Sequence, residues 1–190
     1  YTMYSDTLEY HTISEVAYFF GPSQIIGDSI EARCNRGWHD TKNEISLLMD
    51  KAYIDNKVQI VTGDSLYYEA ERGFGTANYD VTIRDTEQEI IVKGNESWYY
   101  KEPERFMITD SAQFIQVNED DYLFLHADTL RSHTIQDSTM DYRLVRAFYG
   151  CRIYSEDLQA KCDSLSYSFR DSVIRLYYQP VLWSDANQLF

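Results

Sequence analysis

The segment Gly63-Asp64-Ser65-Leu66-Tyr67-Tyr68-Glu69, GDSLYYE, returns about a hundred residues later as CDSLSYS at residues 162–168. Looser copies, in which apolar or aromatic side chains follow an aspartate, begin at residues 6, 28, 50, 110 and 128. Several intervals are near one or two units of about 14 to 22 residues, the length of two short strands and their turns. We therefore expect the chain to repeat one small structural unit.

Two local structures fit this phrase. A helix capped by Asp64 or Ser65 suits the copy at residue 64 alone, because the copies at 6, 28, 128 and 163 lead into β-branched or aromatic residues. In a strand, alternate residues share one face. The phrase then predicts a turn at Asp64 and Ser65, with Leu66 and Tyr68 facing inward and Tyr67 outward. The same spacing predicts these inward pairs in other copies: Leu8 and Tyr10, Ile30 and Ala32, Leu165 and Tyr167.

Composition favours strands throughout the chain. Val, Ile, Thr and the aromatic residues make up 65 of the 190 residues, whereas Ala contributes only 10. Residues 77–84 predict a strand that turns at 85–88 and returns at 89–94, and residues 148–154 predict one that returns at 159–162. We expect one domain over residues 1–190, as a section of a longer chain.

The second hairpin makes Cys151 and Cys162 cross-strand partners, because both are equally far from the centre of its turn. A disulfide is geometrically conceivable there, and two small buried thiols are the alternative. Cys34 has no predicted partner.

The composition and motifs exclude several functional classes. A net charge of −14 opposes nucleic-acid binding. No apolar run reaches the roughly 20 residues of a membrane helix, and no signal peptide is present in this sequence. The four histidines, His11, His39, His126 and His133, form no metal-binding motif, and no phosphate-binding or nucleophile motif occurs. Residues 118–121, Asn-Glu-Asp-Asp, suit calcium, but a charged hairpin turn explains them better. We therefore expect no enzymatic activity, metal or cofactor.

Serial hairpins that are apolar on one face cannot bury that face singly, so neighbouring hairpins must stack. The predicted fold class is all-β: an elongated, partly open antiparallel β-jelly roll built of serial hairpins.

Five segments together resemble the OstA-like proteins of Bacteroidetes-type bacteria, which are related to the LptA-like components of lipopolysaccharide transport. The resemblance runs from residue 6 to about residue 188 and rests on the phrase at 63–68 and on residues 127–130, 141–154, 162–167 and 176–183. It implies a periplasmic, non-enzymatic protein whose apolar interior shelters the acyl chains of lipid A. It also implies bridge formation through exposed edge strands, with partner proteins or with further copies.

Carried over by position, the resemblance implies a lipid groove lined by apolar and aromatic side chains of several strands. These residues are Ile30, Leu66, Tyr68, Val81, Ile83, Ile91, Phe114, Leu130, Phe148, Ile153, Leu165 and Tyr167.

Alternation alone does not distinguish a lipid groove from a closed core. The negative charge also opposes an anionic lipid unless basic residues cluster at the groove mouth. Arg143, Arg146, Arg152 and Lys161 form such a cluster in sequence, and solvated strand faces are the simpler interpretation. The first alternative function is a structural repeat module that pairs through its edges without lipid. A carbohydrate-binding or hydrolytic jelly roll is the next.

Overall fold

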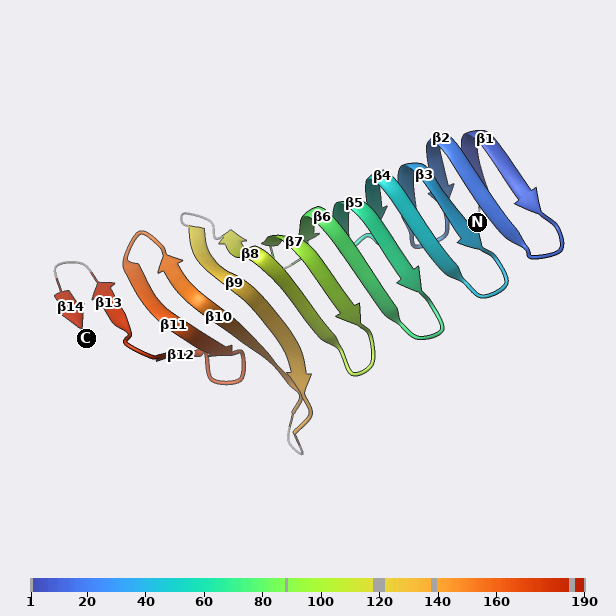
Figure 1. The fold of residues 1–190 in the computed structure, drawn as a ribbon. Helices are drawn as coiled ribbons and strands as arrows, with labels where there is room; N and C mark the ends of the chain where they lie inside the picture. The colour runs from blue at the N-terminus through green and yellow to red at the C-terminus, as the bar shows by residue number, and fades with distance from the viewer. Residues whose placement is uncertain (1, 88, 118–121, 138–139, 185–186, 190) are drawn as a thin grey trace.

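The chain folds into one open antiparallel sheet whose strands follow one another in chain order (Figure 1). The computed structural model describes residues 2–87, 89–117, 122–137, 140–184 and 187–189. The strands are β1 (Thr2–His11), β2 (Val16–Ile26), β3 (Glu31–Asp40), β4 (Ile45–Asp55), β5 (Gln59–Glu69), β6 (Phe74–Asp85), β7 (Ile90–Tyr100), β8 (Arg105–Val117), β9 (Tyr122–Ile135), β10 (Tyr142–Tyr154), β11 (Leu158–Ser168), β12 (Val173–Tyr177), β13 (Val181–Ser184) and β14 (Asn187–Leu189). The predicted all-β class of serial hairpins is confirmed.

Both predicted hairpins are present. Residues 77–84 lie in β6, which pairs with β7, and residues 148–154 lie in β10, which pairs with β11. Cys151 and Cys162 are register partners, as the turn position predicted.

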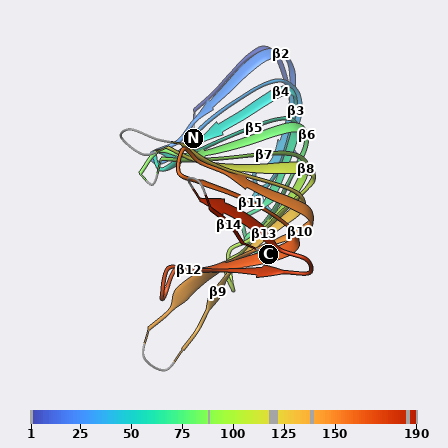
Figure 2. The ribbon, with the colours of Figure 1, turned by 90° about the vertical axis from the view of Figure 1, so that its left-hand side faces the viewer.

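A stack of β-bulges bends the sheet along one line. Each even-numbered strand from β2 to β10 carries one more residue at its middle than its odd-numbered neighbours, and the register shifts there. At each bulge two residues face one residue of the neighbouring strand. Both have positive φ in β4, β6, β8 and β10, as at Asp50 (59°) and Lys51 (66°), and Gly21 (84°) has it in β2. A bulge bends its strand, and bulges in successive hairpins lie side by side, so the whole sheet folds (Figure 2).

The bend divides the sheet into two limbs. We call limb 1 the strand halves that include residues 59–62 of β5 and 81–85 of β6, and limb 2 the halves that include 65–69 of β5 and 74–78 of β6. At the C-terminal end the limbs separate, because β13 pairs with the limb 1 half of β11 and β12 pairs with its limb 2 half. Tyr178 and Gln179, between β12 and β13, again have positive φ.

The repeated motif that begins with Asp64-Ser65 lies at this bend and not at the start of a strand. Asp64 and Ser65 lie inside β5, which corrects the expectation that they form a turn. The odd-numbered strands each place an Asp or Asn opposite the neighbouring bulges. These residues are Asp6, Asn35, Asp64, Asn95, Asp128 and Asp163. The phrase resembles a turn because a bend favours the same short polar side chains.

Small side chains occupy the inside of the bend. Ala112 is opposite Ala127 and Ala52 is opposite Gly63, and all these alanines are buried. A Cβ atom added at Gly94 would lie 2.6 Å from the side chain of Ile108, so little space remains. The three cysteines, Cys34, Cys151 and Cys162, occupy the same row as buried free thiols. Their place in the fold follows from their size.

Candidate functional site

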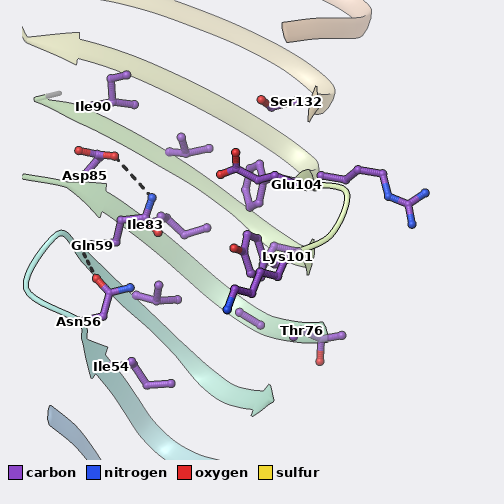
Figure 3. A pocket seen from close by; sticks show the side chains of 18 of the residues that line it. Ile54, Asn56, Gln59, Thr76, Ile83, Asp85, Ile90, Lys101, Glu104 and Ser132 are labelled. Carbon is purple, nitrogen blue, oxygen red and sulfur yellow. Dashed lines mark hydrogen bonds between the residues drawn. The ribbon is translucent and has the colours of Figure 1, made fainter. Parts of the chain in front are cut away.

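A cavity of about 700 Å³ lies between the two limbs, from β4 to β10 (Figure 3). This volume is within the range of small-molecule sites in proteins. The apolar side chains that line it come from both limbs. They include Ile54, Val61, Ile83, Val92 and Phe114 of limb 1, and Leu66, Ala77, Phe106, Leu130 and Val145 of limb 2.

The limb 1 wall is a continuous apolar ladder that crosses the strands. Ile54 is opposite Val61, and Val61 is opposite Ile83. Ile83 is in turn opposite Val92, which is opposite Phe114. Neighbouring strands are about 4.8 Å apart, so the five side chains form a wall roughly 19 Å long. An apolar chain that lies along this wall meets the same kind of surface at every strand.

The rim of limb 1 is polar and partly acidic. Figure 3 shows Asn56, Gln59 and Asp85 together at one end of the cavity. The amide of Gln59 lies 3.5 Å from the Asp85 carboxylate, and the Asn56 side chain accepts the Gln59 backbone N–H at 2.7 Å. These bonds hold the hairpin ends in place above the apolar wall.

The rim of limb 2 carries the basic groups of the cavity. Arg143 forms an ion pair with Glu104 at 3.4 Å, and Thr134 donates a hydrogen bond to the same carboxylate at 3.3 Å. Lys101 also lines this rim, and it forms no ion pair within the described part of the chain. Burial, followed by the nearby Glu104 carboxylate, raises the pKa of Tyr99, so its phenol stays neutral. The two rims therefore differ in charge.

Six of the twelve residues predicted to line the groove lie in this cavity. They are Ile30, Leu66, Tyr68, Ile83, Phe114 and Leu130. Three others, Ile153, Leu165 and Tyr167, belong to the same inward rows at the C-terminal end, outside the cavity. Val81 is almost fully buried at the bend.

Ile91 and Phe148 lie on the other face of the sheet. Val92 is the inward residue of its pair, because it is opposite Ile83, so Ile91 points outward. Ala147 is fully buried on the inner face, which leaves its neighbour Phe148 on the outer one. In β7 the apolar run 90–92 allows either phase, and Ile90 and Val92 take the inner face. In β10 the bulge at residues 149–150 changes the phase, so Phe148 points outward although Ile153 points inward as predicted.

Several lining residues were not predicted from the sequence. Ile54 and Val61 flank the turn between β4 and β5, and Tyr99 and Phe106 flank the turn between β7 and β8. The turn-rich sequence at 55–57 is a signal for the first hairpin, from which both partners follow. The hairpin that pairs Tyr99 with Phe106 has no such clear signal, because the segment between them, residues 101–105, is mostly charged.

The predicted basic cluster does not gather at the cavity. Arg143 lies on the limb 2 rim, but Arg146 is exposed, and Arg152 and Lys161 lie on the outer face of limb 1. Only one of the four is therefore available to a ligand between the limbs.

The described residues hold no cluster of three or more His, Cys, Asp or Glu side chains arranged for a metal ion. The calcium alternative, Asn118, Glu119, Asp120 and Asp121, lies outside the described residues. No described helix is long and apolar enough to cross a bilayer.

The open, bent sheet of serial hairpins is the LptA-like fold. The structure is similar to LptH of Pseudomonas aeruginosa, the LptA-homologous periplasmic component of a lipopolysaccharide transport device. The TM-score is 0.51 at 14% sequence identity, with 63% of this chain and 82% of that chain covered. No protein-family model matches the chain, and no curated protein matches it.

Proposed function

We propose that this chain is a non-enzymatic periplasmic module of lipopolysaccharide transport that holds the acyl chains of lipid A between its limbs. One observation carries the proposal: the inward ladders leave an apolar cavity instead of a filled core. Burial of an acyl chain against such a wall contributes roughly 25 cal/mol per Å² of apolar surface. Because each strand offers an equivalent contact, the wall favours retention without fixing one position.

The fold supports the same proposal. A solved protein with a similar fold belongs to a lipopolysaccharide transport device, and the similarity covers 63% of this chain. The charges at the limb 2 rim suit the anionic head group of an amphiphile, whereas those at the limb 1 rim do not. Lys101 and Arg143 would face its phosphate groups, while the limb 1 rim with Asp85 would face away from them.

The decisive experiment is site-specific photo-crosslinking in cells with a matched pair of neighbouring positions. Val61 lines the cavity, and its neighbour Ile60 points to the opposite face of the same strand. A photoreactive residue at Val61 is expected to give a lipopolysaccharide adduct, and the same residue at Ile60 is expected to give none. Equal adducts at both positions, or none at Val61 in a folded protein, would refute lipid binding between the limbs.

A second candidate is a structural module that pairs with partners through its sheet edges. The strand β1 is an open edge, and Tyr4, Leu8 and Tyr10 on it are 58%, 41% and 48% exposed. An unpaired edge is a template for another strand. A protein adduct from β1 together with no lipid adduct from Val61 would favour this candidate.

A further inference from the structure

The outer face of limb 1 in strands β7 to β11 differs in charge from the rest of the molecule. In strands β7 to β11, the limb 1 segments 90–93, 112–117, 122–127, 151–154 and 158–162 contain no Asp or Glu. Acidic residues make up 31 of the 190 residues, so about four would be expected in these 25 positions. The acids of the same strands lie at the bend, as Asp110, Asp128 and Asp163 do, and the turns next to these strands contain Glu89, Glu156 and Asp157.

A row of exposed hydrogen-bond donors crosses these five strands. Lys93 is opposite Gln113, and Gln113 is opposite His126. His126 is opposite Arg152, which is opposite Lys161. All five side chains are exposed, and the ion pairs found within the described residues include none with the three cations.

A second row beside the first is apolar and aromatic. Ile91, Ile115, Phe124 and Tyr154 are register partners in turn, each two residues from a member of the polar row. The rings of Phe124 and Tyr154 are 6.4 Å apart and both are largely exposed. Lys161 lies over the ring of Trp183 at 5.6 Å, which adds a further aromatic side chain beside the row. Exposed aromatic rings next to cations that form no ion pair indicate a binding surface and not a solvated face.

We propose that this surface binds an extended anionic polysaccharide that lies across the strands of limb 1. The cations and amides would bond its acid groups, and the aromatic row would stack against the apolar faces of its sugar rings. Strands are about 4.8 Å apart, close to the length of one sugar ring, so successive sugars meet successive strands. The surface is separate from the cavity because its side chains project from the opposite face.

The geometry favours a flexible chain over a membrane or a peptide. Neighbouring strands in sheets are rotated relative to one another by about 20 to 25° on average, so the outward direction turns along a row that crosses five strands. A flat bilayer touches only part of such a row, whereas a chain can follow it. An extended acidic peptide repeats its side chains on one face at about 6.7 Å, which does not match the strand spacing.

The test measures binding of the purified chain to polygalacturonate, with neutral dextran and poly-glutamate as comparison polymers. We expect binding to polygalacturonate that weakens with salt, and little binding to dextran. The double variant Arg152→Gln/Lys161→Gln is expected to weaken binding about tenfold, the sum of two exposed charge contacts. The double variant Lys42→Gln/Lys51→Gln removes the same charge elsewhere and is expected to bind as the parent does.

Aromatic variants separate stacking from charge. Phe124→Ala/Tyr154→Ala is expected to weaken polygalacturonate binding several-fold while the salt dependence stays unchanged, and Tyr79→Ala at the exposed bend is the control. No binding to polygalacturonate, or an equal loss in the Lys42/Lys51 variant, would overturn the proposal. Poly-glutamate binding as tight as that of polygalacturonate would identify an acidic peptide as the ligand class instead.

Discussion

The recurrent Asp or Asn of the odd-numbered strands has a defined local role. The side chain of Asn95 accepts a hydrogen bond from the Asp80 backbone N–H at 3.4 Å and donates one to the Asp110 carboxylate at 2.9 Å. It therefore joins the bulges of the two strands beside it. Ser164 donates to Asp163 at 2.6 Å within the second copy of the phrase. Short polar side chains at the bend replace ladder bonds that the bulges interrupt.

The cysteines show how the bend controls side-chain chemistry. Burial, reinforced by neighbouring Cys162, raises the pKa of the Cys151 thiol to about 12. Because the thiolate is the nucleophile, alkylation of Cys151 at pH 8 is expected to be about a thousand times slower in the folded chain than in the unfolded chain. The measurement is iodoacetamide labelling followed by peptide mass spectrometry, with the denatured protein as control. A rate within tenfold of the unfolded value would contradict this prediction.

Mass spectrometry also decides between the two alternatives for this pair, a disulfide or two thiols. Cys151 and Cys162 are directly opposite each other and both are free thiols in the structure, so two thiols are expected. Mass spectrometry of chain purified without reductant distinguishes two thiols from one disulfide.

At the scale of the element, the bulges determine the shape of each strand. Non-glycine residues in the left-handed region cost about 1 to 2 kcal/mol each, and β4, β6 and β8 each accept two of them. The cost is offset because a bent sheet buries one apolar face against itself. Phe19 and Ile108, which are fully buried, lie on that face.

Lys51 provides a test of this strain, because it is exposed and has a φ of 66°. Lys51→Gly is expected to raise the free energy of unfolding by up to about 1 kcal/mol, and Lys51→Val to lower it by about 1 to 2 kcal/mol. Urea denaturation measures both. Lys93, exposed in extended strand, is the matched control: there Val should be tolerated and Gly should destabilise. If the Gly variant were more stable than the Val variant at both positions, or less stable at both, the result would contradict a strained bulge at Lys51.

At the scale of the whole molecule, each strand in the described part of the chain contacts only its neighbours in the sheet. Stability is then a sum of local interfaces, as in repeat proteins. These interfaces run along the sheet and not from limb 1 to limb 2, so the cavity between the limbs can remain unfilled while the sheet persists.

This arrangement predicts graded protection of backbone amides. Hydrogen exchange is expected to be fastest in β1 and in β12 to β14, and slowest in β5 to β9, because opening of an end strand breaks only one interface. Exchange measured by mass spectrometry at peptide resolution tests the gradient. Protection of β1 equal to that of β7 would contradict it, and comparison at two protein concentrations separates edge pairing between copies from intrinsic stability.

The predictions from sequence succeed where local alternation decides the structure. The hairpins of residues 77–94 and 148–162, and the inward positions of Leu66 and Tyr68, follow from period two and turn residues. The predictions fail where a bulge, or two consecutive apolar residues, leaves open which of two neighbouring residues faces inward. Ile91 and Phe148 were assigned to the wrong face for this reason, since either phase of an apolar run looks alike in sequence.

The sequence by itself determined that the chain is all-β, built of serial hairpins, with one apolar face and a repeated polar phrase. Only the tertiary structure decided that this phrase marks a bend, that the bend folds the sheet into two limbs, and that the limbs leave a cavity. The physical reason is that alternation is a property of a single strand. The space between the limbs depends on bulges stacked across many strands and on the angle they produce together, and no single segment of the sequence contains that angle.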